Sequence, residues 1–108
     1  MVLRPCWMRR CFTCQQAAEK ALKGFLTWHQ QPFRKTHNLE EIGEQCLAFD
    51  ATLTDVVDQA ATLTEYAWRF RYPGDPDGID AEEAMEALKV ARLVHEAIAN
   101  RVPPDVTL

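Results

Sequence analysis

The stretch that decides the fold is CQQAAEKALKGFL, which runs from Cys14 to Leu26. Small and apolar residues recur in it at steps of three and four, the spacing of one face of an α-helix. Small side chains on such a face let a second helix approach closely. We therefore predict a helix from about Trp7 to Gln30, which Gln31-Pro32 ends because proline cannot donate a backbone hydrogen bond.

A second helix is predicted after Asn38. Asn38 with Glu41 three residues later is typical of a capped helix start with a reciprocal carboxylate. The apolar stripe that follows ends near Ala48, and its members are Leu39, Ile42, Gly43, Cys46 and Leu47.

Two further segments carry helical stripes. Thr52 or Thr54 can cap the third helix, which we expect to continue to Phe70. Asp80 with Glu83 repeats the cap pattern and predicts a fourth helix that ends near residue 102. Four amphipathic helices with short connections predict an all-α fold, an antiparallel up-and-down bundle.

The composition bounds the class of protein. With 108 residues, 47% of them hydrophobic, we expect one domain over 1–108, with an irregular or short segment at 1–10 and a frayed tail at 103–108. The net charge of −4 excludes nucleic-acid binding through bulk positive potential, so any nucleotide contact must be local.

Because no apolar run approaches the length that a bilayer requires and no signal peptide is recognisable, we expect a cytoplasmic protein without membrane contact.

Four cysteines, Cys6, Cys11, Cys14 and Cys46, are expected to be reduced. Cys11 and Cys14 form a C-x-x-C pair, but a zinc site needs a second pair of ligands at similar spacing, which the chain does not offer. We therefore expect no metal and no cofactor. Cys14 and Cys46 are interpreted as small core residues, and Cys11 as incidental.

Three motifs follow one another along the chain: QQAAEKALK at 15–23, THNL at 36–39 and RYP at 71–73. In this order and spacing they resemble the HEPN domain, a small helical nucleotide-binding module, over roughly Phe12 to Val102. The resemblance implies a helical bundle that binds a nucleotide or the nucleotidylated end of a substrate. It also implies a partner, a separately encoded minimal nucleotidyltransferase, and such pairs often behave as toxin and antitoxin.

The HEPN pattern usually begins with a further helix before the first motif. Residues 1–10, which Pro5 interrupts, are too short to supply it, so we expect that helix to be missing and the remaining stripes to be partly exposed. Either the start of the sequence is truncated or misassigned, or a second copy covers the gap and faces Trp7, Met8 and Phe12. We accordingly expect a homodimer with a two-fold interface formed by the first helix.

The best candidate site lies at the end of the third predicted helix, at Arg71, Tyr72 and Arg69. Arginine matches phosphate geometry with paired hydrogen bonds, and a tyrosine beside it can stack on a base. These cations also fit a structural role, because positive charge at a helix C-terminus interacts favourably with the helix dipole. The shared RYP motif favours a role in binding, with Arg71 ahead of Arg69.

Arg34 and His37 are the second pair of candidates for binding nucleotide or phosphate. They precede a helix start, where backbone amides and the helix dipole attract anions. The alternative is that Thr36 and His37 cap this helix while Arg34 and Lys35 are solvated.

Ribonuclease members of the HEPN group carry Arg-x4-6-His, in which arginine stabilises phosphate charge and histidine transfers a proton. No arginine of this chain has a histidine at that spacing, so no catalytic residue is assigned and we expect a binding module rather than an enzyme. Two alternatives stay open. One is a divergent, metal-independent ribonuclease built from Arg71, Arg69 and His37, and the other is a purely structural oligomerisation partner.

Overall fold

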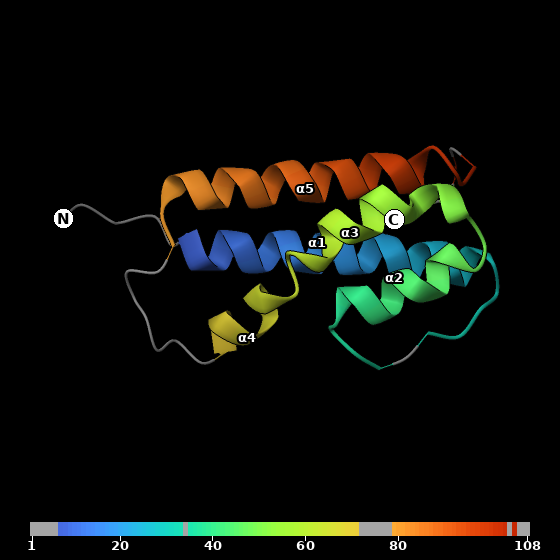
Figure 1. Cartoon of the computed structure of the whole chain (residues 1–108), viewed down its shortest axis with the longest axis horizontal. Helices are drawn as coiled ribbons and strands as arrows, with labels where there is room; N and C mark the ends of the chain where they lie inside the picture. The colour runs from blue at the N-terminus through green and yellow to red at the C-terminus, as the bar shows by residue number, and fades with distance from the viewer. Residues whose placement is uncertain (1–6, 34, 72–78, 104, 106–108) are drawn as a thin grey trace.

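A computed structural model describes residues 7–33, 35–71, 79–103 and 105 of the chain (Figure 1). The helices are α1 (Trp7–Trp28), α2 (Leu39–Leu47), the short 3₁₀ helix η1 (Ala51–Leu53), α3 (Thr54–Ala61), α4 (Glu65–Arg71) and α5 (Ala81–Ala99). The described ranges contain no strand. The predicted all-α bundle is therefore confirmed.

In the bundle, α1 and α5 lie side by side and run in the same direction (Figure 1). After α1 the chain turns back, so that α2 starts beside the middle of α1 and runs the same way (Figure 1). His37 accordingly contacts Glu19, whereas Cys46 contacts Leu22 further along. The segment formed by α3 and α4 runs in the opposite direction and supplies the antiparallel member of the bundle.

The end of α1 is a Schellman motif. Gln30 adopts the left-handed conformation with φ 56°, and the amide of Gln31 donates to the carbonyl oxygen of Leu26 at 2.9 Å. This arrangement satisfies carbonyl groups of the last turn before Pro32 directs the chain away. The predicted end of the first helix is confirmed.

Two of the predicted helix caps are confirmed. Asn38 Oδ1 accepts from the amides of Glu40 and Glu41 at 2.9 and 3.4 Å. Asp80 Oδ1 accepts from the amide of Glu83 at 2.9 Å and so starts α5. Each cap satisfies amides that a helix start leaves without intrahelical partners.

The prediction for the third helix is wrong in two respects. Neither Thr52 nor Thr54 caps it, because the N-cap of α3 is Leu53, which makes no side-chain hydrogen bond. The side-chain cap in this region is Asp50, which accepts from the amide of Thr52 at the start of η1. The helix is also divided at residues 62–64 into α3 and α4, where Thr62 Oγ1 donates back to the carbonyl oxygen of Gln59 and the backbone hydrogen bonds shorten to the 3₁₀ pattern. Threonine side chains that bond to nearby backbone compete with the helical ladder and explain the break.

The core lies between the inner face of α1 and the other helices. Leu22, Phe25 and Leu26 of α1 are at most 1% exposed. At the crossing of α2 and α3, a Cβ on Gly43 would overlap the side chain of Val57, so only glycine permits this close approach.

The described cysteines belong to the core. Cys11, Cys14 and Cys46 are all free and buried, which confirms the interpretation of Cys14 and Cys46; Cys11 is fully buried and therefore not incidental. Burial raises the pKa of the Cys11 thiol to about 11 and that of Cys46 to about 12, so both stay protonated at neutral pH.

Candidate functional site

Two of the five predicted site residues can be placed with their side chains. Arg34 and Tyr72 lie outside the described residues, and Arg71 is the last residue of α4 but its side chain also lies outside them. His37 lies in the connection before α2, and Arg69 lies on α4. These two side chains belong to two separate polar clusters along α1.

The first of these, the Glu19 cluster, consists of Gln15, Glu19, Lys23 and His37. The carboxylate of Glu19 is 2.8 Å from His37 Nδ1 and 3.2 Å from Lys23 Nζ, and it accepts from Gln15 Nε2 at 3.0 Å. Gln15 Nε2 also lies 3.3 Å from the backbone oxygen of His37. The cluster therefore fixes the connection before α2 to the middle of α1.

The electrostatics of this cluster follow from the burial of Glu19, whose side chain is 8% exposed. Burial alone would favour the neutral acid. The hydrogen bonds from His37, Gln15 and Lys23, together with the positive charge of Lys23, outweigh burial and lower the pKa of Glu19. Because an ionised carboxylate can only accept, Nδ1 of His37 carries its proton and faces Glu19.

The N-terminus of α2 is occupied by protein acceptors. Thr36 Oγ1 accepts from the amide of Asn38 at 3.0 Å, and Thr64 Oγ1 accepts from the amide of Leu39 at 3.1 Å. With Asn38 capping the next two amides, the backbone donors at this helix start are already bonded. An anion that bound here would have to displace one of these side chains.

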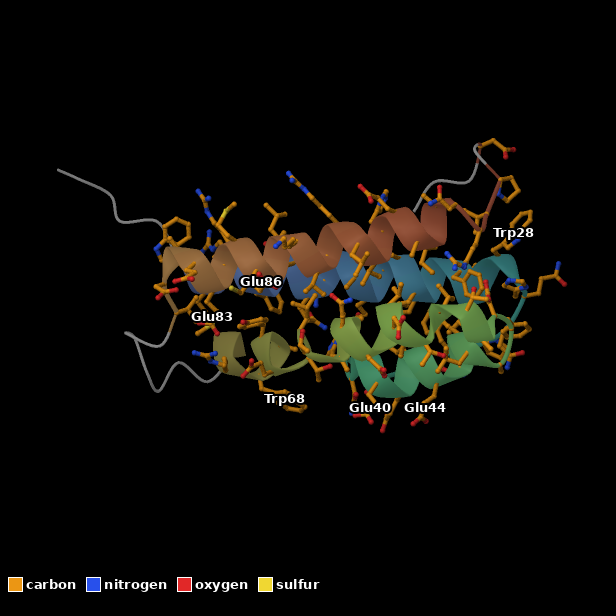
Figure 2. All side chains as sticks on the ribbon, turned by 45° about the horizontal axis from the view of Figure 1, so that its top comes forward. Trp28, Glu40, Glu44, Trp68, Glu83 and Glu86 are labelled. Atoms are coloured by element: carbon orange, nitrogen blue, oxygen red, sulfur yellow. The ribbon has the colours of Figure 1, made fainter. Side chains whose placement is uncertain are left out.

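The second cluster, the Glu83 cluster, consists of Cys11, Tyr66, Arg69 and Glu83. Oε1 of Glu83 accepts from the hydroxyl of Tyr66 at 2.9 Å and from Arg69 Nη1 at 3.2 Å. Figure 2 shows Glu83 on the side of α5 that faces α4. Its carboxylate therefore joins α5 to α4. The backbone amide of Glu83 separately donates a hydrogen bond to the cap Asp80.

Arg69 has further partners in this cluster. Its guanidinium lies 3.7 Å from Glu65 Oε2 and over the ring of Tyr66 at 5.7 Å from the ring centroid. Burial raises the pKa of Tyr66, and its hydrogen bond to the Glu83 carboxylate raises it further. The tyrosine hydroxyl therefore keeps its proton and donates a hydrogen bond to the Glu83 carboxylate. Arg69 is held between two carboxylates, those of Glu65 and Glu83.

The two clusters do not merge. Tyr66 interacts electrostatically with Cys11 in the first half of α1, whereas His37 contacts Glu19 about two helical turns further along. Within the described part of the chain, no hydrogen bond or ion pair joins Arg69 to His37. A common site for these two predicted residues would need a ligand that spans the two clusters.

Sequence reasoning missed Gln15, Glu19, Tyr66 and Glu83 as members of these clusters. A signal for the first two was present, because Gln15 and Glu19 stand four residues apart on the helix face that Cys11, Ala18 and Leu22 define. Polar side chains on a buried face are held there only with partners. No comparable signal marked Glu83, which reads as an ordinary second member of a cap pattern.

Among the described residues, no three His, Cys, Asp or Glu side chains are grouped so that they could hold a metal ion. Among these same residues, no helix has the length and apolar character needed to cross a bilayer.

The family model of the HEPN domain matches residues 7–102, a range that contains every described helix. No curated protein and no solved structure matches the chain. The motifs at 15–23, 36–39 and 71–73 all fall within the matched range, and the chain belongs to the HEPN domain family.

Proposed function

We propose that this chain is a helical module that binds a nucleotide, or the nucleotidylated end of a substrate, and has no catalytic activity of its own. The observation that carries the proposal is the Glu19 cluster. It joins the first two HEPN motifs of the sequence through the contact of 2.8 Å between Glu19 and His37. A buried polar network that positions a partly exposed histidine is an arrangement suited to holding a ligand.

The proposed binding residues are Arg71, Tyr72, Arg69, His37 and Arg34. Arg69 is already held by Glu83 and Glu65, so a phosphate would have to compete with two carboxylates for it. Arg71, the arginine of the RYP motif, is therefore the main phosphate ligand in this proposal. Paired charge-assisted hydrogen bonds from arginine contribute about 1.5 to 3 kcal/mol each.

Isothermal titration calorimetry with each of the four ribonucleoside triphosphates tests this site. Arg71→Ala should weaken binding about ten-fold or more, because it removes charge-assisted hydrogen bonds. Lys20→Ala, which removes an exposed cation of α1, is the matched control and should change affinity less than about two-fold. Equal losses in the two variants, or no binding by the wild type, would contradict the proposed site.

The proposed partner is a separately encoded minimal nucleotidyltransferase, and the pair would act as toxin and antitoxin with this chain as the toxin-like half. Its support is the resemblance of the motifs to the HEPN type that occurs with such enzymes. The test is to express this chain, tagged, with the product of the neighbouring open reading frame. Co-purification of a small nucleotidyltransferase is the expected result, and a neighbouring gene of another class would contradict the pairing.

A divergent ribonuclease is the second candidate, and the Glu19–His37 contact favours it. A buried carboxylate that holds Nδ1 of a partly exposed histidine is the way in which acid–base histidines are commonly oriented. The test is RNA cleavage in the presence of a chelator. Cleavage that is lost in both His37→Ala and Arg71→Ala would support this candidate, and an inert wild type would exclude it.

We also propose that the chain acts as a two-fold homodimer. Large apolar side chains with exposures of 47% to 64% support this, namely Trp28, Trp68 and Met85. Trp7, in contrast, packs partly buried against the core, and Met8 and Phe12 are also partly buried. Sedimentation of a stable monomer at micromolar concentration would contradict the proposed dimer.

A further inference from the structure

The face of α5 that points away from the core carries a continuous stripe of exposed and half-buried side chains. The stripe has the spacing of one helix face, and its members are Glu82, Met85, Glu86, Lys89, Arg92, Leu93 and Glu96. On the opposite face, Ala87, Val94 and Ile98 are buried. No other described element covers this stripe, which we call the α5 stripe.

The α5 stripe is more apolar than a solvated helix face needs to be. Met85 is 64% exposed, and Leu88 and Leu93 beside it are half-buried. Together with Gln59 of α3, these side chains line an open groove of about 810 Å³. Apolar side chains gathered in one groove, with charged residues around them, are typical of a surface that contacts another protein.

The charges of the stripe are ordered along the helix. Glu82 and Glu86 lie in its first half, Lys89 and Arg92 follow them, and Glu96 stands at its end. In a two-fold contact centred near residue 87 or 88, Glu96 lies beyond the other copy's Glu82. Among the described residues, none of these five side chains takes part in an ion pair. The stripe therefore presents an acidic half and a basic segment, both available to a partner.

The order of these charges favours one orientation of a second copy of α5 over the other. A parallel copy of α5 would place Glu86 against Glu86 and Lys89 against Lys89, which is repulsive. An antiparallel copy, related by a two-fold axis near residue 87 or 88, places the acidic half of each stripe on the basic segment of the other. Such a two-fold contact repeats every favourable pair twice.

We propose that the α5 stripe is the dimer interface, packed antiparallel on the same stripe of a second copy. Glu86 lies against Lys89 of the other copy, and Glu82 lies against Arg92 of the other copy. Met85 and Leu88 pack around the axis. This inference rests on the dimeric state proposed above and moves the interface from the start of α1, where the sequence predicts it, to α5.

Sedimentation velocity of the full chain over a range of micromolar concentrations tests the interface. Met85→Asp should raise the dissociation constant of the dimer at least about ten-fold, because it places a charge among the central apolar side chains. Because Met85 is exposed within one copy, the substitution should leave the helical circular dichroism unchanged. Glu44→Lys on α2, whose glutamate points outward in Figure 2, is the matched control and should leave the dimer intact.

Charge reversal gives the sharper result. Glu86→Lys and Lys89→Glu should each weaken the dimer about five-fold by juxtaposing like charges, whereas the double variant restores opposite charges and should dimerise within about two-fold of wild type. A dimer insensitive to Met85→Asp and to both reversals would overturn the α5 interface while leaving the homodimer in place. A monomeric wild type that binds nucleotide in calorimetry would overturn both the interface and the dimer but not the proposed binding function.

Discussion

The two polar clusters of this chain hold their central carboxylates in different ways. The side chain of Glu19 is 8% exposed and has hydrogen-bond partners on α1 and on the connection before α2, whereas that of Glu83 is 31% exposed and is shared by Tyr66 and Arg69. Buried polar groups lose much when one partner is removed, whereas partly exposed groups can turn to water. The comparison indicates that the Glu19 cluster anchors the fold, and that the Glu83 cluster has partners which a ligand could replace.

The largest expected effect is that of Glu19→Ala. It removes the carboxylate that accepts from the fully buried Gln15 and from Nδ1 of His37, so we expect a loss of about 2 to 3 kcal/mol in the free energy of unfolding. Urea unfolding followed by circular dichroism measures it. Glu44→Ala, at an exposed position of α2, is the control and should cost less than about 0.5 kcal/mol. Similar midpoints for the two variants would show that the Glu19 cluster is not an anchor.

A smaller and pH-dependent effect follows from the lowered pKa of Glu19. The folded protein binds this proton less readily than the unfolded chain, so ionised Glu19 stabilises the fold above the ordinary pKa of 4.5, and this contribution is lost as pH falls through the lowered value. The stability difference between wild type and Glu19→Gln should therefore narrow as pH falls from 7 to 3. Because both proteins contain the same other carboxylates, a difference that stays constant over this range would contradict the argument.

The helix cap next to each cluster can be removed by a substitution with the same expected loss of stability, which allows the two regions to be compared. Asn38 adjoins His37 of the Glu19 cluster, and Asp80 starts the helix that carries Glu83. Asn38→Ala and Asp80→Ala should each lower the free energy of unfolding by about 1 kcal/mol, because each removes a side-chain acceptor for helix amides. Urea melts measure both, with Asn38→Asp and Asp80→Asn as conservative controls that keep the acceptor. Unchanged midpoints in the alanine variants would mean that the caps contribute no stability.

Much of the fold could be predicted from sequence because its signals are local. The apolar spacing of residues 14–26, Pro32 and the caps Asn38 and Asp80 each depend on a few neighbouring residues. The break between α3 and α4 could not be predicted, because an unbroken apolar spacing crosses it. It depends in part on Thr64, which accepts from the amide of Leu39, a residue 25 positions earlier in the chain.

The candidate site was less predictable because its contacts join residues that lie far apart in the sequence. His37 and Arg69 were selected from their places near helix ends, but their partners come from other helices. Glu19 pairs with a residue 18 positions away, and Glu83 with one 14 positions away, and helical periodicity contains no information about such pairs. Only the direction of α2 relative to α1 brings the connection before α2 back to Glu19.

The smallest expected effect on stability is that of Arg69→Ala. Arg69 is 28% exposed, and ion pairs of this kind contribute about 0.2 to 1 kcal/mol because water screens them and the side chain loses freedom. The hydroxyl of Tyr66 still donates to Glu83 in the variant, so the carboxylate keeps its more buried partner. We expect the free energy of unfolding to fall by less than about 1 kcal/mol in urea unfolding, and the loss to be smaller in high salt.

A loss of about 2 kcal/mol or more would place Arg69 among the anchors of the fold. A phosphate could then recruit it only by destabilising the contact between α4 and α5, and ligand binding would have to depend on Arg71 without Arg69.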